Sequence, residues 1–205
     1  MSRIFISYRR EDSAWPAGRI YEHLANRFGR EAIFKDVDAI RAGDNFKECI
    51  DEAVGKCDVL LAIIGQRWLH VTDGQGRRRL DNPADWVRLE IETALNRSDV
   101  RVIPVLLENV AMPAAQDLPA SLQPLCYRHA ASIRQDPDFS RDMKYVLDII
   151  DQQLTEADVL SQQHKEQLTK ADVLSQQSKE LTARLEKIKR QRTDIRRVID
   201  MFGND

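Results

Sequence analysis

The residues best suited to chemistry in this chain lie in one short amphipathic stretch, residues 85–95. Glu90 follows Trp86 by four positions, so the two side chains would lie one turn apart on the same side of a helix. Glu90 has two interpretations. It is an exposed acid beside a half-buried Trp86, as is usual because glutamate is nearly always solvated, or it is a carboxylate at the floor of a pocket whose wall is the indole. A carboxylate in such a pocket can orient a substrate and stabilise a developing positive charge.

The sequence lacks the motifs of several other catalytic sites. It contains no glycine-rich phosphate loop of the Walker or Rossmann type and no Gly-x-Ser-x-Gly elbow. The histidines and cysteines show no metal-ligand spacing, so we expect no metal site. Asp36 and Asp38 follow a predicted strand and suggest a phospho-acceptor receiver. That fold needs an acid pair after its first strand, where Ser7, Tyr8 and Arg9 stand here.

Composition favours a cytoplasmic protein. A net charge of -2 over 205 residues gives no field that would attract nucleic acid or an acidic membrane. No apolar run approaches the roughly 20 residues that cross a bilayer, and no apolar signal core follows Met1. Cys49, Cys57 and Cys126 are odd in number and far apart, which suits reduced thiols better than disulfides. We therefore expect a cytoplasmic localisation and neither nucleic-acid nor membrane partners.

Apolar runs alternate with helical patterns through the first 150 residues. The expected strands are residues 3–8, 32–34, 58–65, 101–107 and a weak fifth near 127–133, and the expected helices are 14–28, 46–54, 84–96 and one that starts at 140. This alternation predicts a parallel sheet with helices on both faces. The run 58–65 is apolar on both faces and should be central, whereas Pro104 indicates a strand end or an edge strand.

Ligands of such sheets bind beyond the carboxyl ends of the strands. The predicted loops 8–13 and 36–45 and the loop after Gly65 all leave from those ends, and the stretch with Glu90 follows the third of them. Residues 9–13 are expected to be loop. The topology therefore permits Glu90 to line a cleft without requiring it.

The composition changes near residue 150, which we take as the boundary between a domain, 1–150, and a helical tail, 151–205. Between Pro137 and Gly203 the chain contains neither proline nor glycine. Residues 154–166 recur as 168–180 with eleven of thirteen positions identical, an offset of 14 that equals two heptads. We place the boundary inside a continuous helix.

The second half of the tail carries an apolar seam. Its positions alternate in steps of three and four, and seven of the nine are apolar: Leu174, Ser178, Leu181, Leu185, Ile188, Arg192, Ile195, Ile199 and Phe202. A helix of about 50 residues would be roughly 75 Å long, too long to bury such a stripe on a small domain. Two arrangements remain, a self-associating coiled coil or a helix that folds back or docks on another protein.

Basic residues are interleaved with this seam. They are Arg184, Lys187, Lys189, Arg190, Arg192, Arg196 and Arg197. A solvated coiled-coil face explains them better than nucleic-acid binding does.

Four fragments in a fixed order resemble the Toll/interleukin-1 receptor (TIR) domain family, in its bacterial branch. They are Phe-Ile-Ser-Tyr-Arg-Arg at 5–10, Phe-Lys-Asp-Val at 34–37 with Gly43 and Phe46, Cys-Asp-Val-Leu-Leu at 57–61, and Trp86-x-x-x-Glu90. The resemblance covers residues 1–150 and not the tail. It implies a flavodoxin-like fold with five parallel strands and helices on both faces, here followed by a long C-terminal helix.

The resemblance also implies one of two activities. Many members of the family cleave NAD+ at the nicotinamide–ribose bond to give nicotinamide and ADP-ribose or a cyclic ADP-ribose signal. NAD+ is the substrate of this reaction, and no cofactor is implied. Others are non-enzymatic scaffolds that only assemble. The catalytic glutamate of the cleaving members falls on Glu90. Glu92 competes for the role, but it points about 200° away around the helix.

The chemistry of NAD+ cleavage is compatible with a single acid. Pyridinium leaves as neutral nicotinamide, so no general acid is needed, unlike in ordinary glycosidases. The transition state is a ribosyl cation, which one ionised carboxylate can stabilise.

The resemblance assigns nucleotide contacts after the first strand. Tyr8 would stack on a ring, and Arg9 or Arg10 would pair with the pyrophosphate. Solvated loop cations are the alternative for both arginines. Phe46 and Trp86 would sandwich the base or the nicotinamide, although Phe46 is equally suited to the core.

Residues 36–45, which include Asp36 and Gly43, correspond to a loop that in assembled family members reaches a neighbouring domain. The expected partners are therefore NAD+, further copies of the chain through TIR–TIR contacts and the tail, and another TIR protein.

Overall fold

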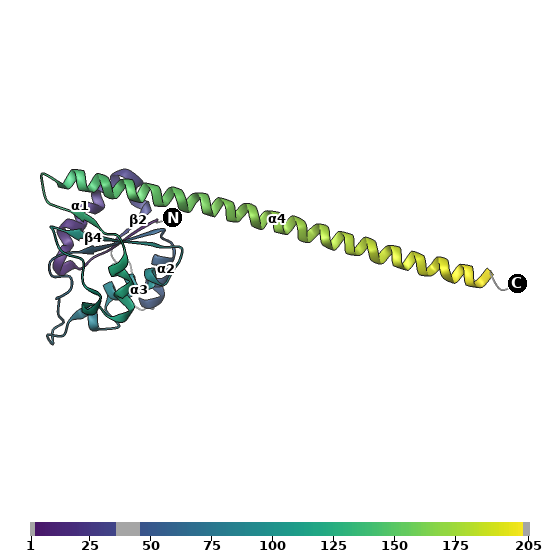
Figure 1. Ribbon diagram of the computed structural model, residues 1–205, viewed down its shortest axis with the longest axis horizontal. Helices are drawn as coiled ribbons and strands as arrows, with labels where there is room; N and C mark the ends of the chain where they lie inside the picture. The colour runs from purple at the N-terminus through teal and green to yellow at the C-terminus, as the bar shows by residue number, and fades with distance from the viewer. Residues whose placement is uncertain (1–2, 36–45, 203–205) are drawn as a thin grey trace. The chain divides into compact units, whose positions relative to one another are not determined.

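The computed structural model describes residues 3–35 and 46–202, and in them five parallel strands form one sheet (Figure 1). The sheet order is β2-β1-β3-β4-β5, which is the flavodoxin-like order. The predicted fold class is confirmed. The strands are β1 (Ile4–Ser7), β2 (Ile33–Lys35), β3 (Val59–Ile64), β4 (Arg101–Leu107) and β5 (Ala131–Ile133).

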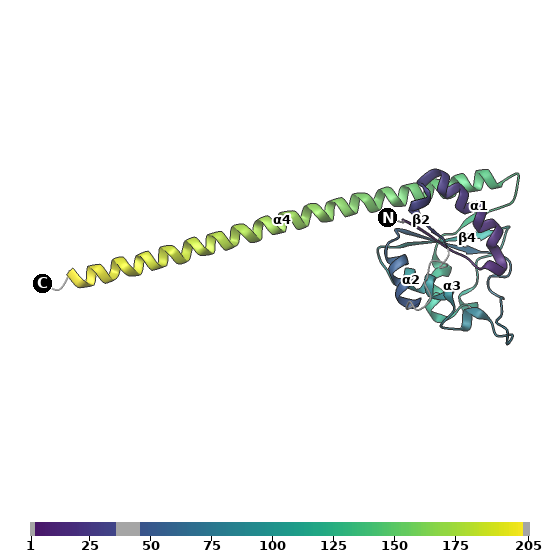
Figure 2. The same cartoon turned by 180° about the vertical axis from the view of Figure 1, so that it is seen from behind.

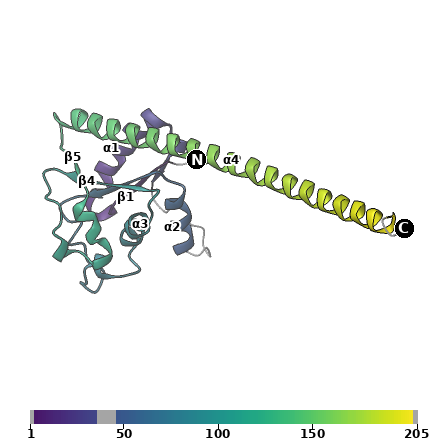
Figure 3. The same cartoon turned by 45° about the vertical axis from the view of Figure 1, so that its right-hand side comes forward.

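Helices cover both faces of the sheet. The α-helices of the described residues are α1 (Arg10–Phe28), α2 (Phe46–Gly55), α3 (Trp86–Leu95) and α4 (Phe139–Phe202). Short 3-10 helices join them: η1 (Arg30–Ala32), η3 (Arg79–Asp81), η4 (Ala115–Asp117) and η5 (Ala120–Tyr127). Helix α1 and the first turns of α4 pack on one face, and α2 and α3 pack on the other (Figures 2 and 3).

Strand β3 shows why the sheet needs helices on both sides. Its odd residues Val59, Leu61 and Ile63 belong to the core under α1 and α4, and its even residues belong to the core over α2 and α3. All six residues are buried, and β3 pairs with β1 and β4. The central position predicted for this strand is confirmed.

Two expectations about the strands were wrong. Pro104 lies neither at a strand end nor on an edge strand, because it is in the middle of β4 and β4 pairs with both β3 and β5. The pairing of β4 with β5 begins only at Val105. On that side of β4, Pro104 therefore removes no hydrogen bond between strands by lacking an N–H. Strand β5 is also shorter than predicted, because the chain up to Tyr127 forms η5 and only residues 131–133 pair.

The start of α1 was also placed too late. The helix begins at Arg10, although residues 9–13 were expected to be loop, and it has a break at Ser13 with φ −136° and ψ 21°. Pro16 lies one turn later in the same helix. A proline cannot donate to the carbonyl four residues before it, which here belongs to Asp12, so regular helix is weakened around Ser13.

The chain divides into two compact units, residues 1–157 and 158–205. In the first unit, Phe139, Met143, Val146, Ile150 and Leu154 of α4 are buried in the core. The second unit consists of the rest of α4, so the long C-terminal helix is confirmed. In the described part of the chain, no helix combines the length and the apolar character needed to cross a membrane.

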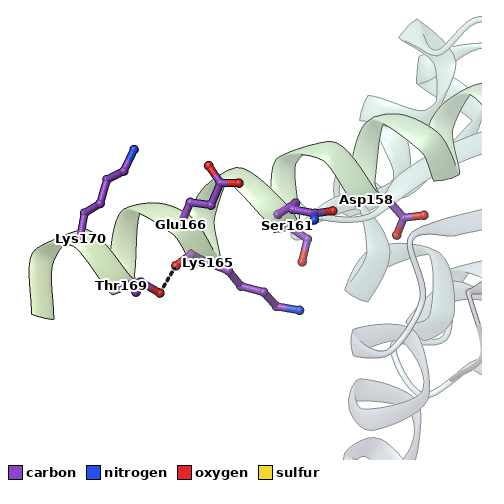
Figure 4. A pocket seen from close by; sticks show the side chains of 7 residues that line it. Asp158, Ser161, Lys165, Glu166, Thr169 and Lys170 are labelled. Atoms are coloured by element: carbon purple, nitrogen blue, oxygen red, sulfur yellow. Dashed lines mark hydrogen bonds between the residues drawn. The ribbon is translucent and has the colours of Figure 1, made fainter. Parts of the chain in front are cut away.

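From Asp158 to Thr193 every residue of α4 is exposed. Figure 4 shows the segment from Asp158 to Lys170, where polar side chains fan out from a single helix. The hollow between them is lined by residues of α4 alone, and one helix by itself does not enclose a ligand.

A carboxylate ties the first turn of α1 to the end of β3. Asp12 accepts hydrogen bonds from the backbone N–H of Gly65 at 3.0 Å and of Arg67 at 2.7 Å. A Cβ on Gly65 would meet this carboxylate well inside van der Waals distance. Glycine is therefore needed at 65 for the close approach of Asp12.

We expect Gly65→Ala to lower the free energy of unfolding by about 2–4 kcal/mol, because both charge-assisted hydrogen bonds must lengthen or break. Urea denaturation followed by circular dichroism measures it. Gly74→Ala is the matched control, since a Cβ there meets no atom within 4 Å. Equal stability of the two variants would contradict the role of Asp12.

Candidate active site

Helix α3 carries the candidate catalytic residue. Asp85 caps the helix: its carboxylate accepts from the backbone N–H of Arg88 at 3.0 Å, so the helix begins at Trp86. The buried residues are Val87, Glu90, Ile91 and Ala94. Glu90 thus shares the face that packs toward the sheet.

Trp86 and Glu90 were expected on the same side of this helix, with the indole half-buried or forming the wall of a pocket. Trp86 is 43 % exposed, and Glu90 is only 5 % exposed. The interpretation of Glu90 as an exposed acid is therefore wrong. Because glutamate is ordinarily solvated, the sequence pattern alone could not choose between the two interpretations of Glu90.

Glu90 is held at the end of the first strand. Its Oε2 accepts a hydrogen bond of 2.6 Å from Oγ of Ser7, the last residue of β1. Both side chains are buried, so this hydrogen bond fixes the carboxyl group of Glu90 at the end of β1. In the order β2-β1-β3-β4-β5 the direction of winding reverses between β1 and β3, which is where ligands of this topology bind.

Ser7 had no predicted role. It lies inside the Phe-Ile-Ser-Tyr-Arg-Arg fragment, and its position at a strand end was the one available signal. Its partner Glu90 is 83 residues away in the sequence. Nothing local in the sequence indicates that pair.

Arg9 lies in a buried ion pair. Its Nη1 and Nη2 donate to the two oxygens of Asp85 at 3.0 and 2.8 Å, and its Nε donates to the carbonyl oxygen of Trp68 at 3.2 Å. Arg9 is 1 % exposed, so its interpretation as a solvated loop cation is wrong. The pair joins the end of β1, the loop after β3 and the cap of α3.

A second arginine supports the same carboxylate from outside. Arg79 Nε donates to Asp85 Oδ2 at 3.1 Å, and its Nη1 pairs with Glu11 Oε1 at 2.5 Å. Asp85 therefore accepts from Arg9, Arg79 and the backbone of Arg88. A buried aspartate with this many donors has its charge compensated.

The other predicted site residues are placed as follows. Tyr8 is half-buried, and Nζ of Lys35 lies 5.6 Å from the centre of its ring. Arg10 is exposed at the first position of α1. Phe46 begins α2, whereas Asp36 and Gly43 lie outside the described residues. The structure thus brings Glu90, Ser7 and Arg9 to one end of the sheet.

Glu92, the competing candidate, has a different environment. Its Oε1 accepts from Nε of Arg88 at 2.6 Å and from the hydroxyl of Ser121 in η5. Arg88 also donates to the carbonyl oxygen of Leu80 at 3.1 Å. Glu92 therefore connects α3 to η5.

Cys57 is a packing residue. It is buried, its Sγ donates to the carbonyl oxygen of Ala53 at 3.2 Å, and burial raises the pKa of the thiol to about 12. At neutral pH it stays protonated. Among residues 3–35 and 46–202, no three His, Cys, Asp or Glu side chains gather to hold a metal ion.

A family model for the TIR domain matches residues 4–141. The chain belongs to the TIR domain family. One solved structure that it resembles is that of the TIR domains of the activated Roq1 resistosome, which recognises the pathogen effector XopQ. The likeness has a TM-score of 0.55 and 13 % sequence identity, and covers 73 % of this chain and 99 % of that one.

A second similar structure is a metazoan TIR-STING receptor from C. gigas in complex with 2',3'-cGAMP. The TM-score is 0.45 with 17 % identity, over 69 % of this chain and 38 % of that one. No curated protein matches the chain. At 13 % identity, the likeness to the Roq1 TIR domains supports the fold alone.

We expect Arg9→Met to lower the free energy of unfolding by about 3 kcal/mol, because it leaves a buried carboxylate without its bidentate partner. Urea denaturation gives the value. Arg30→Met is the control, because Arg30 pairs with Glu22 on the surface, where such a pair contributes under about 1 kcal/mol. Equal and small losses of unfolding free energy in both variants would show that the pair of Arg9 and Asp85 does not stabilise the fold.

Proposed function

We propose that this protein cleaves NAD+ at the nicotinamide–ribose bond, as an NAD+ nucleosidase with Glu90 as its catalytic carboxylate. The observation that best supports the proposal is a buried carboxylate at the switch point of a TIR-family sheet, aligned by Ser7. NAD+ is the substrate, and the reaction needs no cofactor.

In the proposed reaction, the bond between the ribose C1′ and the pyridinium nitrogen breaks. Its electron pair goes to the nitrogen, which leaves as neutral nicotinamide. Glu90 stabilises the ribosyl cation that remains. Water then adds its oxygen to C1′ and releases a proton, which gives ADP-ribose. Attack by a nitrogen of the adenine instead of water gives a cyclic ADP-ribose.

Ser7 and Arg9 are positioning residues in this proposal. Ser7 holds one oxygen of Glu90, and Arg9 fixes the first turn of α3 through Asp85. Tyr8, Arg10 and Trp86 remain the proposed nucleotide contacts, together with Phe46, Asp36 and Gly43 from the sequence resemblance. Because the donors of Arg9 are directed at Asp85 and Trp68, we assign the pyrophosphate to Arg10.

The matched pair Glu90→Gln and Glu92→Gln tests the assignment. Both variants remove one carboxylate from α3 and keep its shape. We expect Glu90→Gln to lose activity by about 10²-fold or more. Glu92→Gln should keep most of it, because an amide oxygen still accepts from Arg88 and Ser121. Nicotinamide release from NAD+ by the concentrated full-length chain is the measurement, and equal losses would reject Glu90 as the catalytic residue.

Family members act in assemblies, and we propose that TIR–TIR contacts between copies of this chain, or with another TIR protein, complete its site. The full-length chain displayed on beads at rising density should release nicotinamide about tenfold faster per molecule, because display raises the local concentration. Beads with Glu90→Gln give the background. A rate per molecule that does not depend on density would mean that each domain works alone.

If clustered wild-type chains release no nicotinamide at all, the alternative takes over: a signalling scaffold that acts through TIR–TIR and coiled-coil contacts. The exposed apolar seam of α4 is the observation that favours it. In either case we propose a role in signal transduction in the cytoplasm, of the antiphage-defence type that the resemblance to the bacterial branch suggests.

A further inference from the structure

The tail exposes an apolar seam with coiled-coil spacing. Its described members, Leu174, Leu181, Leu185, Ile188 and Ile195, are between 57 and 65 % exposed. The seam positions alternate in steps of four and three, and Ser178 and Arg192 occupy the two positions that are not apolar. The five apolar residues therefore share one narrow stripe. Covering apolar side chains of this size with a partner helix is favourable, because it removes their surface from water. The seam therefore needs a partner.

The heptad positions follow from this spacing. Positions d are 174, 181, 188 and 195, and positions a are 178, 185 and 192. Residues next to the seam, at e and g, decide which helix a coiled coil accepts. From 174 to 195 the e and g residues are Ser175, Gln177, Thr182, Arg184, Lys189 and Gln191.

None of these six flanking residues is acidic, and Arg184 and Lys189 are basic. A third cation, Arg192, occupies a seam position itself. The acidic residues of the segment, Glu180, Glu186 and Asp194, stand at positions c, b and c, away from the seam. Glu186 forms an exposed pair with Lys189 of the same helix at 2.9 Å, an interaction weak enough to exchange.

A second copy is a poor partner for this segment. In a parallel dimer Arg184 would face Lys189 of the other chain, and the two Arg192 side chains would meet inside the seam. In an antiparallel dimer e faces e and g faces g, so cations again meet cations or neutral residues. Self-association, which the apolar spacing alone favours, is therefore opposed by charge in both orientations.

An anionic lipid surface fits less well than a helix. A helix that lies in a membrane interface buries a broad apolar face, whereas this stripe is the narrow a/d kind. Arg192 also interrupts the stripe near the C-terminal end of the segment. A guanidinium inside a coiled-coil seam is accommodated when the partner supplies a carboxylate opposite it.

We propose that residues 174–195 bind a helix of another protein whose own apolar seam is flanked by acidic residues, with a carboxylate opposite Arg192. The proposal concerns the second compact unit alone and holds whether or not the domain cleaves NAD+. It selects the docking arrangement of the tail over the self-associating one. Such a partner could carry several acidic helices and so bring several domains together.

The test uses the full-length chain and two fluorescent peptides of four heptads with the same apolar seam. One peptide has Glu at e and g and one Glu at a position a, and the other has Lys at the same places. We expect the acidic peptide to bind about 100-fold more tightly than the basic one, and less tightly as salt rises. Fluorescence anisotropy measures both affinities, and circular dichroism confirms that the tail remains helical.

Two triple variants separate seam recognition from net charge. Arg184→Glu/Lys189→Glu/Arg192→Glu reverses the charges beside and within the seam, and should exchange the preference for the two peptides. Lys179→Glu/Lys187→Glu/Arg190→Glu reaches the same net charge on the opposite side of the helix. This second variant should keep the preference of the wild type.

Three results would overturn the proposal. The first is no binding of the acidic peptide at about 100 μM. The second is an equal loss in both triple variants, which would mean a diffuse attraction for any polyanion, lipid or nucleic acid included. The third is a full-length dimer in sedimentation experiments that Leu185→Asp dissociates, which would show that the seam binds a second copy.

Discussion

The buried ion pair of Arg9 and Asp85 is the interaction on which the candidate site depends. It joins the end of β1, the loop after β3 and the cap of α3, three segments that are far apart in the sequence. Two charges buried together are stable only while each has the other, so the pair fixes the three segments to one another. Glu90 lies one turn into the helix that Asp85 caps. Its position therefore depends on a pair that does no chemistry itself.

Local patterns were sufficient for most of the scaffold and insufficient for the site. The limits of β4 and the central place of β3 follow from apolar runs whose residues face helices on both sides. Whether Glu90 is buried could not be inferred from the pattern of α3, because a carboxylate is ordinarily solvated. The burial of Arg9 was unpredictable for a different reason, because its partner Asp85 lies 76 residues further along the chain.

The two units of the chain differ in whether their large apolar side chains are buried. In the domain, large aliphatic residues of the sheet are covered by α1, α2, α3 and the start of α4. In the tail, residues of the same kind remain on the surface, because one isolated helix has no second layer. The described core of the domain is thus covered by its own helices, whereas in our proposal the tail supplies one half of an interface. Its charges then limit the choice of the other half.

The repeat of 14 residues in the tail has a consequence for how such proteins can diverge. Adding or deleting one repeat changes the helix length by about 21 Å. Because 14 residues equal two heptads, the apolar positions downstream stay on the same seam of the supercoil. Duplication can therefore lengthen the helix in discrete steps while the partner-binding positions keep their register. Insertions of other lengths would rotate those positions off the seam.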